Sequence, residues 1–411
     1  MLLGGSPPHL RHGRRAVCCR HWAHSITVRF DMSTLATLTA GSALAAPNPG
    51  TALRDVVVRS VGRATPALAA AVGKGLGLPV ETVVRSVYRA PATLLQRVAP
   101  ELAERLCDLL NATGLEVQVV PEGQVVDTPP LWDAAAHVLN PARLHEAAEA
   151  LARFTGLSVA AAQEALLTPP GVVLGGVSAA SIEALKATLP EGVVELVAVL
   201  PQDSRYALHL LPCAEMVARG VLEDVRKLGL EPLAREGIIA IDLEHRTAQA
   251  LWQRHSRTGA LRLIHTAFLR YTVSLQGPMQ AFSPAQATLL SERAGVPTEL
   301  LPHLLGALPV GLHEDLPHAD LPELMAAYAA VGLNVQADLS SFKRYTLELT
   351  HAQDPALAQR LLVQQSAWPA GQPLPAMPCS TTPALSRPRA RQLQALLEAA
   401  GCDAYLEEHH G

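Results

Sequence analysis

Three short stretches of this chain carry residue types whose spacing could support chemistry. The first is Gly73-Lys74-Gly75-Leu76-Gly77, where three glycines and a lysine look like a loop that cradles phosphate. Such a loop needs a strand before it and a helix after it, so that backbone N–H groups point at the anion. The preceding ATPALAAAV is typical of a helix instead. We therefore interpret the glycines as a helix-to-helix turn and predict no nucleotide site.

The other two stretches place histidines beside carboxylates. His313-Glu314-Asp315-Leu316-Pro317-His318 is similar to a zinc-protease helix, but its histidines are one residue too far apart and its proline breaks a helix. We interpret it as a solvated loop. Asp242-Leu243-Glu244-His245 would not converge on a helix, because adjacent positions do not face each other, and we expect it on the surface. His209 alternates with apolar neighbours and is predicted to lie on a strand face. The sequence predicts no catalytic residue, no metal site and no cofactor, so we expect a protein that is not an enzyme.

Composition narrows the classes of partner. Hydrophobic residues make up 49% of the 411 residues and charged residues 17%, which indicates a globular chain. Residues 1–31 contain five Arg and one Asp, a net charge of +4 against −4 for the whole chain, so residues 32–411 carry −8. That acidic remainder argues against nucleic acid as a partner. No run approaches the roughly 18–20 apolar residues of a membrane span. Widely spaced cysteines without a C-x-x-C pair suit a reducing compartment, and we expect a cytoplasmic protein.

The first residues share no periodicity with the rest of the chain. We interpret residues 1–53 as an N-terminal extension that is disordered or wrongly assigned as coding sequence, with Met32 as the true beginning if residues 1–31 are not translated. Two alternatives are weaker. Cys18, Cys19, His21 and His24 match no zinc spacing, and TLATLTAGSALAAPNPG ends like a signal-peptidase site but has a weak apolar core.

Glycines recur along the chain in two sets. One set precedes presumed closing strands at intervals of about 67–78 residues: Gly114, Gly192, Gly259, Gly332 and Gly401. A second set lies upstream: Gly77, Gly156, Gly229 and Gly295. Three of the second set are followed 14 positions later by a proline: Pro91, Pro170 and Pro309. Markers in step at a fixed period indicate internal repeats.

Each repeat has the same pattern of elements. An apolar β-like segment is followed by a helix, the glycine turn, a second helix that ends at proline, a connection able to hold a brief strand, a third helix and a closing strand. The fold class is therefore α+β, a tandem array of about five β-α-α-(β)-α-β modules, each with a small antiparallel sheet covered by helices. The modules are expected at 54–123, 131–201, 205–268, 269–340 and 341–408. The third lacks the proline and the fifth lacks the first glycine, so these two are the most divergent.

The module resembles the C-terminal domain of the bacterial ribosomal stalk protein, whose fold is shared with the Clp-protease adaptor. The residues that carry the resemblance are GLGLPVETVVRSVYRAP and ELAERLCDLLNATGLEVQVV in module one, TGLSVAAAQEALLTPP in module two and AGVPTELLPHLLGALP in module four. In the family, lysines four and seven residues after the turn glycine contribute to a docking surface. Those positions are occupied here by Glu81 and Val84, Ala160 and Gln163, and Glu299 and Pro302.

The resemblance implies a fold and a protein-docking role at the turn between the first two helices. The expected binding residues are Gly77, Leu78, Gly156, Leu157, Gly295 and Val296. We therefore expect a protein-binding scaffold or adaptor whose partners are proteins. Two alternatives stay open: a ribosome- or translation-associated factor, and an enzyme whose site lies between modules.

Overall fold

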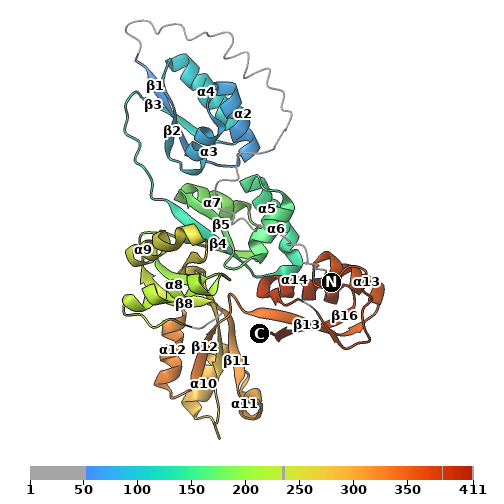
Figure 1. The fold of residues 1–411 in the computed structure, drawn as a ribbon. Coiled ribbons are helices and arrows are strands. Elements are labelled where there is room, and N and C mark those ends of the chain that lie inside the picture. Colours follow the sequence, from blue (N-terminus) through green and yellow to red (C-terminus); the bar gives the residue numbers. More distant parts are fainter. Residues whose placement is uncertain (1–51, 234–236, 382, 410–411) are drawn as a thin grey trace, which may run out of the picture.

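The computed structural model describes residues 52–233, 237–381 and 383–409 (Figure 1). These residues form helices and five small antiparallel sheets, which confirms the predicted α+β class. We number each sheet with its intervening helices as a unit, 1 to 5, in chain order. The predicted N-terminal extension, residues 1–53, lies outside the described residues except for residues 52 and 53.

Units 1 and 2 have the same order of elements. Unit 1 consists of β1 (Arg54–Ser60), α2 (Pro66–Leu76), α3 (Val80–Tyr88), β2 (Ala92–Val98), α4 (Pro100–Ala112) and β3 (Glu116–Pro121). Unit 2 consists of β4 (Trp132–Val138), η1 (Pro141–Arg143), α5 (Leu144–Thr155), α6 (Val159–Leu167), β5 (Val172–Val177), α7 (Ala179–Thr188) and β6 (Val194–Val199). The connections predicted to hold a brief strand do so in both.

The remaining three units vary this order. Unit 3 consists of β7 (Arg205–Leu210), α8 (Glu215–Lys227), β8 (Ile238–Glu244), α9 (His245–His255), η2 (Ser256–Thr258) and β9 (Leu261–His265), followed by η3 (Thr266–Phe268). Unit 4 consists of β10 (Arg270–Leu275), α10 (Pro284–Ala294), η4 (Thr298–Leu300), α11 (Leu301–Ala307), β11 (Val310–Pro317), α12 (Leu321–Ala330) and β12 (Val335–Leu339). Unit 5 consists of β13 (Arg344–Ala352), α13 (Pro355–Gln364), β14 (Cys379–Ser380), β15 (Leu385–Ser386), α14 (Arg387–Ala399) and β16 (Cys402–Glu408).

Units 3 and 5 depart from the predicted order. Within the described residues, a single helix separates the first two strands of each unit, α8 in unit 3 and α13 in unit 5. The expected second helix after Gly229 is therefore absent from the described part of unit 3, where residues 230–233 are irregular. In unit 5, residues 370–378 are irregular, because closely spaced prolines cannot continue a helix. These are the two units in which a sequence marker is missing.

The opening strand is central in every sheet. The orders are β2-β1-β3, β5-β4-β6, β8-β7-β9 and β11-β10-β12, and β13 pairs with β14 and β15 on one side and β16 on the other. A central strand is covered on both edges and packs against helices, so its residues are buried. This explains the apolar runs, such as Val56, Val57 and Val58 in β1, which are fully buried.

Four sheets carry a β-bulge at the same place in the second strand. The residue at the bulge has a positive φ each time: Arg97, Gly176, Asp242 and Asp315. In units 1 and 2 an aspartate of the opening strand holds the bulge. Asp55 Oδ1 accepts a hydrogen bond from Arg97 N (2.9 Å), and Asp133 Oδ1 accepts one from Gly176 N (2.8 Å). The bulge is thus a shared feature of the fold rather than a local irregularity.

Both sets of recurring glycines adopt the backbone conformation that their turns require. Gly77, Gly156 and Gly295 follow α2, α5 and α10 with φ of 68°, 75° and 63°. All five glycines before the closing strands also have positive φ. Glycine adopts this left-handed region without a steric penalty, so it ends a helix at little cost.

The chain folds back on itself between its second and fifth units. Figure 1 shows unit 1 at one end and unit 5 beside unit 2. Ser386 Oγ donates a hydrogen bond to Leu167 O (2.9 Å) across a separation of 219 residues, and Arg389 pairs with Glu164 on α6. Units 1 and 2 share one continuous hydrophobic core. Units 3, 4 and 5 each have a core of their own, and a further cluster that includes Ala207, Ile264 and Tyr271 joins unit 3 to unit 4.

Candidate functional site

The glycine-rich stretch of unit 1 is a helix end. Gly73 and Gly75 lie within α2, and Gly77 is its C-cap, where Leu78 N donates to Gly73 O (2.8 Å). The interpretation as a helix-to-helix turn is confirmed. A Cβ at Gly73 would lie 3.2 Å from Leu78 O and 3.3 Å from Val83 Cγ2, so this glycine allows α3 to pack closely against α2.

The predicted binding residues divide into exposed and packed ones. Gly77, Gly295 and Leu157 are exposed. Leu78 and Val296 are half-buried and pack against the hydrophobic cores of their units, so their side chains serve the fold first. The role of the six predicted turn residues in binding stays a prediction.

Each of the three two-helix turns nevertheless exposes one aliphatic side chain. The exposed fractions are 39% for Val80, 38% for Leu157 and 49% for Leu300. We name these three residues the turn aliphatics. Val80 lies three residues after Gly77 and Leu300 five residues after Gly295, each at or next to the start of the second helix, and that position was the available signal.

The turn of unit 2 also forms one wall of a groove. The groove has a volume of about 440 Å³ and is lined by Thr65, Pro66 and Ala67 at the start of α2 and by residues of the α5–α6 region, including Arg153 and Leu157. Because its walls come from two units, no single repeat contains it.

Both histidine–carboxylate stretches have structures other than those expected. His313, Glu314 and Asp315 lie on strand β11 rather than in a loop, and His313 Nε2 lies 2.6 Å from the Tyr328 hydroxyl. The stretch from Asp242 to Glu244 lies on β8 rather than a helix, although both carboxylates are exposed as predicted. A β-bulge interrupts the regular strand pattern at Asp242.

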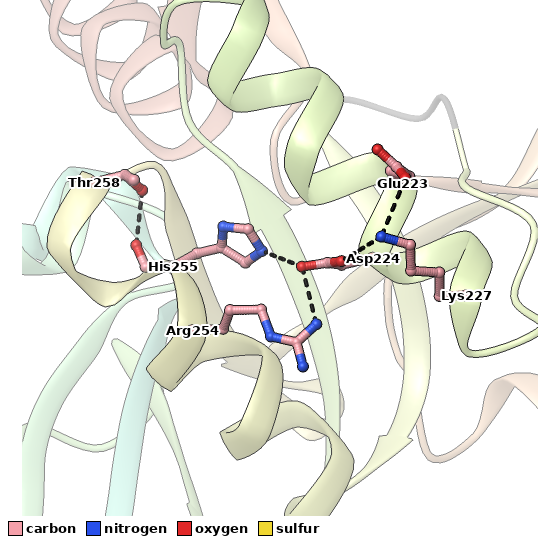
Figure 2. A network of polar contacts seen from close by, with 6 residues as sticks. All are labelled: Glu223, Asp224, Lys227, Arg254, His255 and Thr258. Atoms are coloured by element: carbon pink, nitrogen blue, oxygen red, sulfur yellow. Dashed lines mark hydrogen bonds and ion pairs between the residues drawn. The ribbon is translucent and has the colours of Figure 1, made fainter.

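A further histidine–carboxylate group, centred on Asp224, joins α8 to α9 (Figure 2). Asp224, itself largely buried, pairs with His255 Nε2 and Arg254 Nη1, each at 3.1 Å, and with Lys227 at 3.4 Å. Lys227 also pairs with Glu223 at 3.0 Å. Hydrogen bonds from Arg254 hold the pKa of Asp224 below its usual value, against the opposing effect of burial. Because Asp224 on α8 contacts both Arg254 and His255 on α9, we interpret this group as a structural contact that holds the two helices together.

The junctions between successive units use a recurring pair of residues. The second residue of the opening strand is a tyrosine in units 3, 4 and 5, and its partner on the paired strand, β8, β11 or β15, is a leucine. Two residues after that leucine lies a basic side chain that packs on the tyrosine ring: His245 on Tyr206, His318 on Tyr271 and Arg387 on Tyr345, at 5.5, 5.6 and 6.0 Å.

Two of these basic residues reach back to the bulge aspartate of the preceding unit. His318 Nε2 lies 3.0 Å from Asp242 Oδ1, and Arg387 Nη1 lies 2.9 Å from Asp315 Oδ1. The preceding bulge residue for His245 is Gly176, which has no side chain. There, His265 pairs with Asp133 instead, at 3.0 Å.

A cleft lies where units 2, 4 and 5 meet. Its volume is about 310 Å³, and its polar lining includes His137, Glu195, Arg270, Ser340 and Arg387. We name it the central cleft. None of these five residues was predicted as part of a site, because isolated arginines at strand and helix starts look like ordinary surface charges. The recurring Arg-Tyr pair that opens units 3, 4 and 5 was the available signal.

The described residues contain neither a cluster of metal ligands nor a membrane-spanning helix. No three or more His, Cys, Asp and Glu side chains there gather in a way that could hold a metal ion. Within the same residues, no helix has both the length and the apolar character needed to cross a membrane.

No family model, curated protein or solved structure matches this chain. We therefore infer the function from the geometry of the described residues.

Proposed function

We propose that this chain is a non-enzymatic, cytoplasmic protein-binding scaffold built from five copies of one stalk-protein-like module. The repeat is supported by the bulge at one register in four sheets and by the tyrosine–leucine–cation pattern in the last three units. The four cysteines of the described residues are free, in keeping with a reducing compartment.

One observation carries the binding role: each of the three two-helix units exposes an aliphatic side chain at its turn. A single exposed apolar side chain is ordinary on a protein surface, so the support comes from the recurrence of one at the same helix-to-helix turn in three units. Acidic residues accompany two of them, Glu81 beside Val80 and Glu299 beside Leu300, and both are exposed. We therefore propose a partner protein that inserts apolar side chains flanked by basic ones.

Several such contacts on one chain would add through effective concentration. The partner would then be held by turns that are individually weak. A variant at a single turn is expected to weaken capture modestly, whereas the combined variant should abolish it.

The test compares two triple variants in affinity purification from native lysate. Val80→Ser, Leu157→Ser and Leu300→Ser together remove the turn aliphatics, while Val125→Ser, Met216→Ser and Leu228→Ser remove other apolar side chains, which are 85%, 82% and 48% exposed. We expect a discrete protein that co-purifies with the native chain and the control but not with the turn variant. Equal recovery with both variants would overturn the proposal.

A further inference from the structure

The central cleft gathers buried polar atoms that the described residues do not satisfy. Eight buried side-chain nitrogen or oxygen atoms of the described residues have no hydrogen-bond partner there. Four of the eight belong to residues that line this one cleft: His137 Nε2, Arg270 Nη1, Ser340 Oγ and Arg387 Nη1. An unsatisfied buried polar group costs about 1–3 kcal/mol, so such a concentration in one place points to a ligand.

Arg270 is the central group of this set. It is the first residue of β10, and only 5% of its surface is exposed. Its Nη2 lies 2.5 Å from Glu195 Oε2 on β6, and its backbone N–H donates to Ser341 Oγ at 2.7 Å. The guanidinium is therefore fixed on one side by Glu195, while Nη1 on the other side keeps a hydrogen free for an acceptor.

Arg387 is held in a similar way from unit 5. Its Nη2 lies 2.5 Å from Glu314 Oε2, and its Nη1 lies 2.9 Å from Asp315 Oδ1, although that second contact lacks the angle of a hydrogen bond. It too is almost wholly buried.

Arg270 and Arg387 lie deeper in the cleft than Glu195 and Glu314, their carboxylate partners, whereas Asp315 and Arg391, which also line it, are 39% and 33% exposed and pair with each other. The Arg270 side chain is 6% exposed and its partner Glu195 45%, while the Arg387 side chain is 9% exposed and its partner Glu314 73%. Water screens the more exposed carboxylates of Glu195 and Glu314 more strongly than the buried guanidinium groups. The interior of the cleft therefore favours an anion although the paired charges balance.

The two uncharged members complete a set of donors. The Ser340 hydroxyl is buried and can donate to any acceptor within reach. Burial, with Arg270 nearby, lowers the pKa of His137 to about 3, so its imidazole is neutral at pH 7 and can donate from one ring nitrogen.

We propose that the central cleft binds a small molecule through an oxyanion group, a carboxylate or a phosphate, held by Arg270 Nη1, Arg387 Nη1, Ser340 Oγ and His137 Nε2. The volume of about 310 Å³ lies at the small end of the range of ligand sites. The lining comes from three units, so ligand binding would tie units 2, 4 and 5 together. This site is separate from the turn aliphatics and does not depend on the proposed scaffold role.

The test is titration of the full chain with inorganic phosphate, with succinate and with uncharged succinamide, followed by calorimetry and by the shift in melting temperature. We expect phosphate or succinate to bind and to raise the melting temperature, and succinamide to do neither. Binding of phosphate alone identifies a phosphorylated ligand, and binding of succinate alone a carboxylic acid. Each of these outcomes supports the site once the variants below confirm its place.

Two variants and a matched control locate the binding. Arg270→Lys should weaken anion binding about tenfold or more, since a hydrogen bond to a charged group is lost. Ser340→Ala should weaken it about two- to tenfold, and it breaks no hydrogen bond of the described fold, so folding is preserved. The control is Arg205→Lys, because Arg205 opens β7 as Arg270 opens β10 but lies half-exposed away from the cleft. Failure of both anions to bind, or equal binding by the native chain and the Ser340→Ala variant, would overturn the proposal.

Discussion

His318 ties unit 4 to unit 3 through a hydrogen bond in which its Nε2 lies 3.0 Å from Asp242 Oδ1. Arg387 repeats this contact one unit further along, with Asp315 as its partner. In both cases the acceptor lies at the β-bulge of the preceding unit, where a positive φ turns the side chain out of the strand pattern. The bulge thus supplies the junction with a carboxylate that a regular strand would point elsewhere.

Removal of the carboxylate at Asp315 should destabilise the junction between units 4 and 5. Asp315 pairs with both Arg387 and Arg391, and Asp315→Asn leaves the buried Arg387 with Glu314 alone. We expect the free energy of unfolding to fall by about 1–3 kcal/mol, measured by urea denaturation.

The matched control for Asp315 is its neighbour. Glu314→Gln removes a carboxylate that also contacts Arg387 but is mostly exposed, so its loss should cost less than about 1 kcal/mol. If Glu314→Gln were as destabilising as Asp315→Asn, the bulge aspartate would have no special role.

Stability should fall as the solution is acidified, because two histidines are buried in the neutral form. Burial lowers the pKa of His137 to about 3 and that of His209 to about 4, with smaller contributions from Arg270 and Arg262. In the unfolded chain these histidines take up protons below about pH 6.5. The unfolded state therefore binds more protons between about pH 6.5 and pH 4, and each group lowers stability by up to about 1.4 kcal/mol per pH unit.

The pH dependence is checked by urea denaturation at several pH values. His209→Leu removes one titrating group and should flatten the decline, whereas His351→Leu, at an exposed position on β13, should leave it unchanged. An identical slope for the native chain and His209→Leu would contradict the assignment.

Tyr88 should matter to the contact between units 1 and 2. Its hydroxyl donates to Phe154 O, its ring packs edge-on against the Phe154 ring with centroids 5.5 Å apart, and its own carbonyl accepts from Ser181 Oγ at 2.8 Å. Tyr88→Phe keeps the ring but leaves a buried carbonyl without its donor, which should cost about 1–3 kcal/mol. Tyr405→Phe, at an exposed position, is the control, and equal unfolding midpoints for the two variants would argue against this contact.

Two glycines with similar φ should respond differently to substitution. Gly77 has φ 68° and open space where a Cβ would lie, so Gly77→Ala should cost only about 1 kcal/mol of conformational energy. Gly171 has φ 76°, and a Cβ there would lie 2.4 Å from Ala136 O in the adjacent strand. Gly171→Ala should therefore cost clearly more, about 2–4 kcal/mol, as the loss of melting temperature will show. Similar losses at both sites would be inconsistent with the close approach of strand β4.

Much of each unit follows from the sequence by itself. The apolar opening strands, the helix ends at glycine or proline and the spacing of the closing glycines all reflect local conformational preferences and burial within one unit. For this reason the α+β class and the turn at Gly77 could be predicted. The missing second helices of units 3 and 5 coincide with missing markers, so local sequence carries that information as well.

Only the tertiary structure decided how the units meet. The contact of Ser386 with Leu167 joins residues 219 positions apart, and no local sequence pattern specifies it. The carboxylates that pair with Arg270 and Arg387 belong to other units, Glu195 to unit 2 and Glu314 to unit 4, so hydrophobic periodicity within one unit does not mark these arginines. Periodicity reports which side of an element faces its own core, while a cleft between units depends on polar side chains brought together by the path of the whole chain.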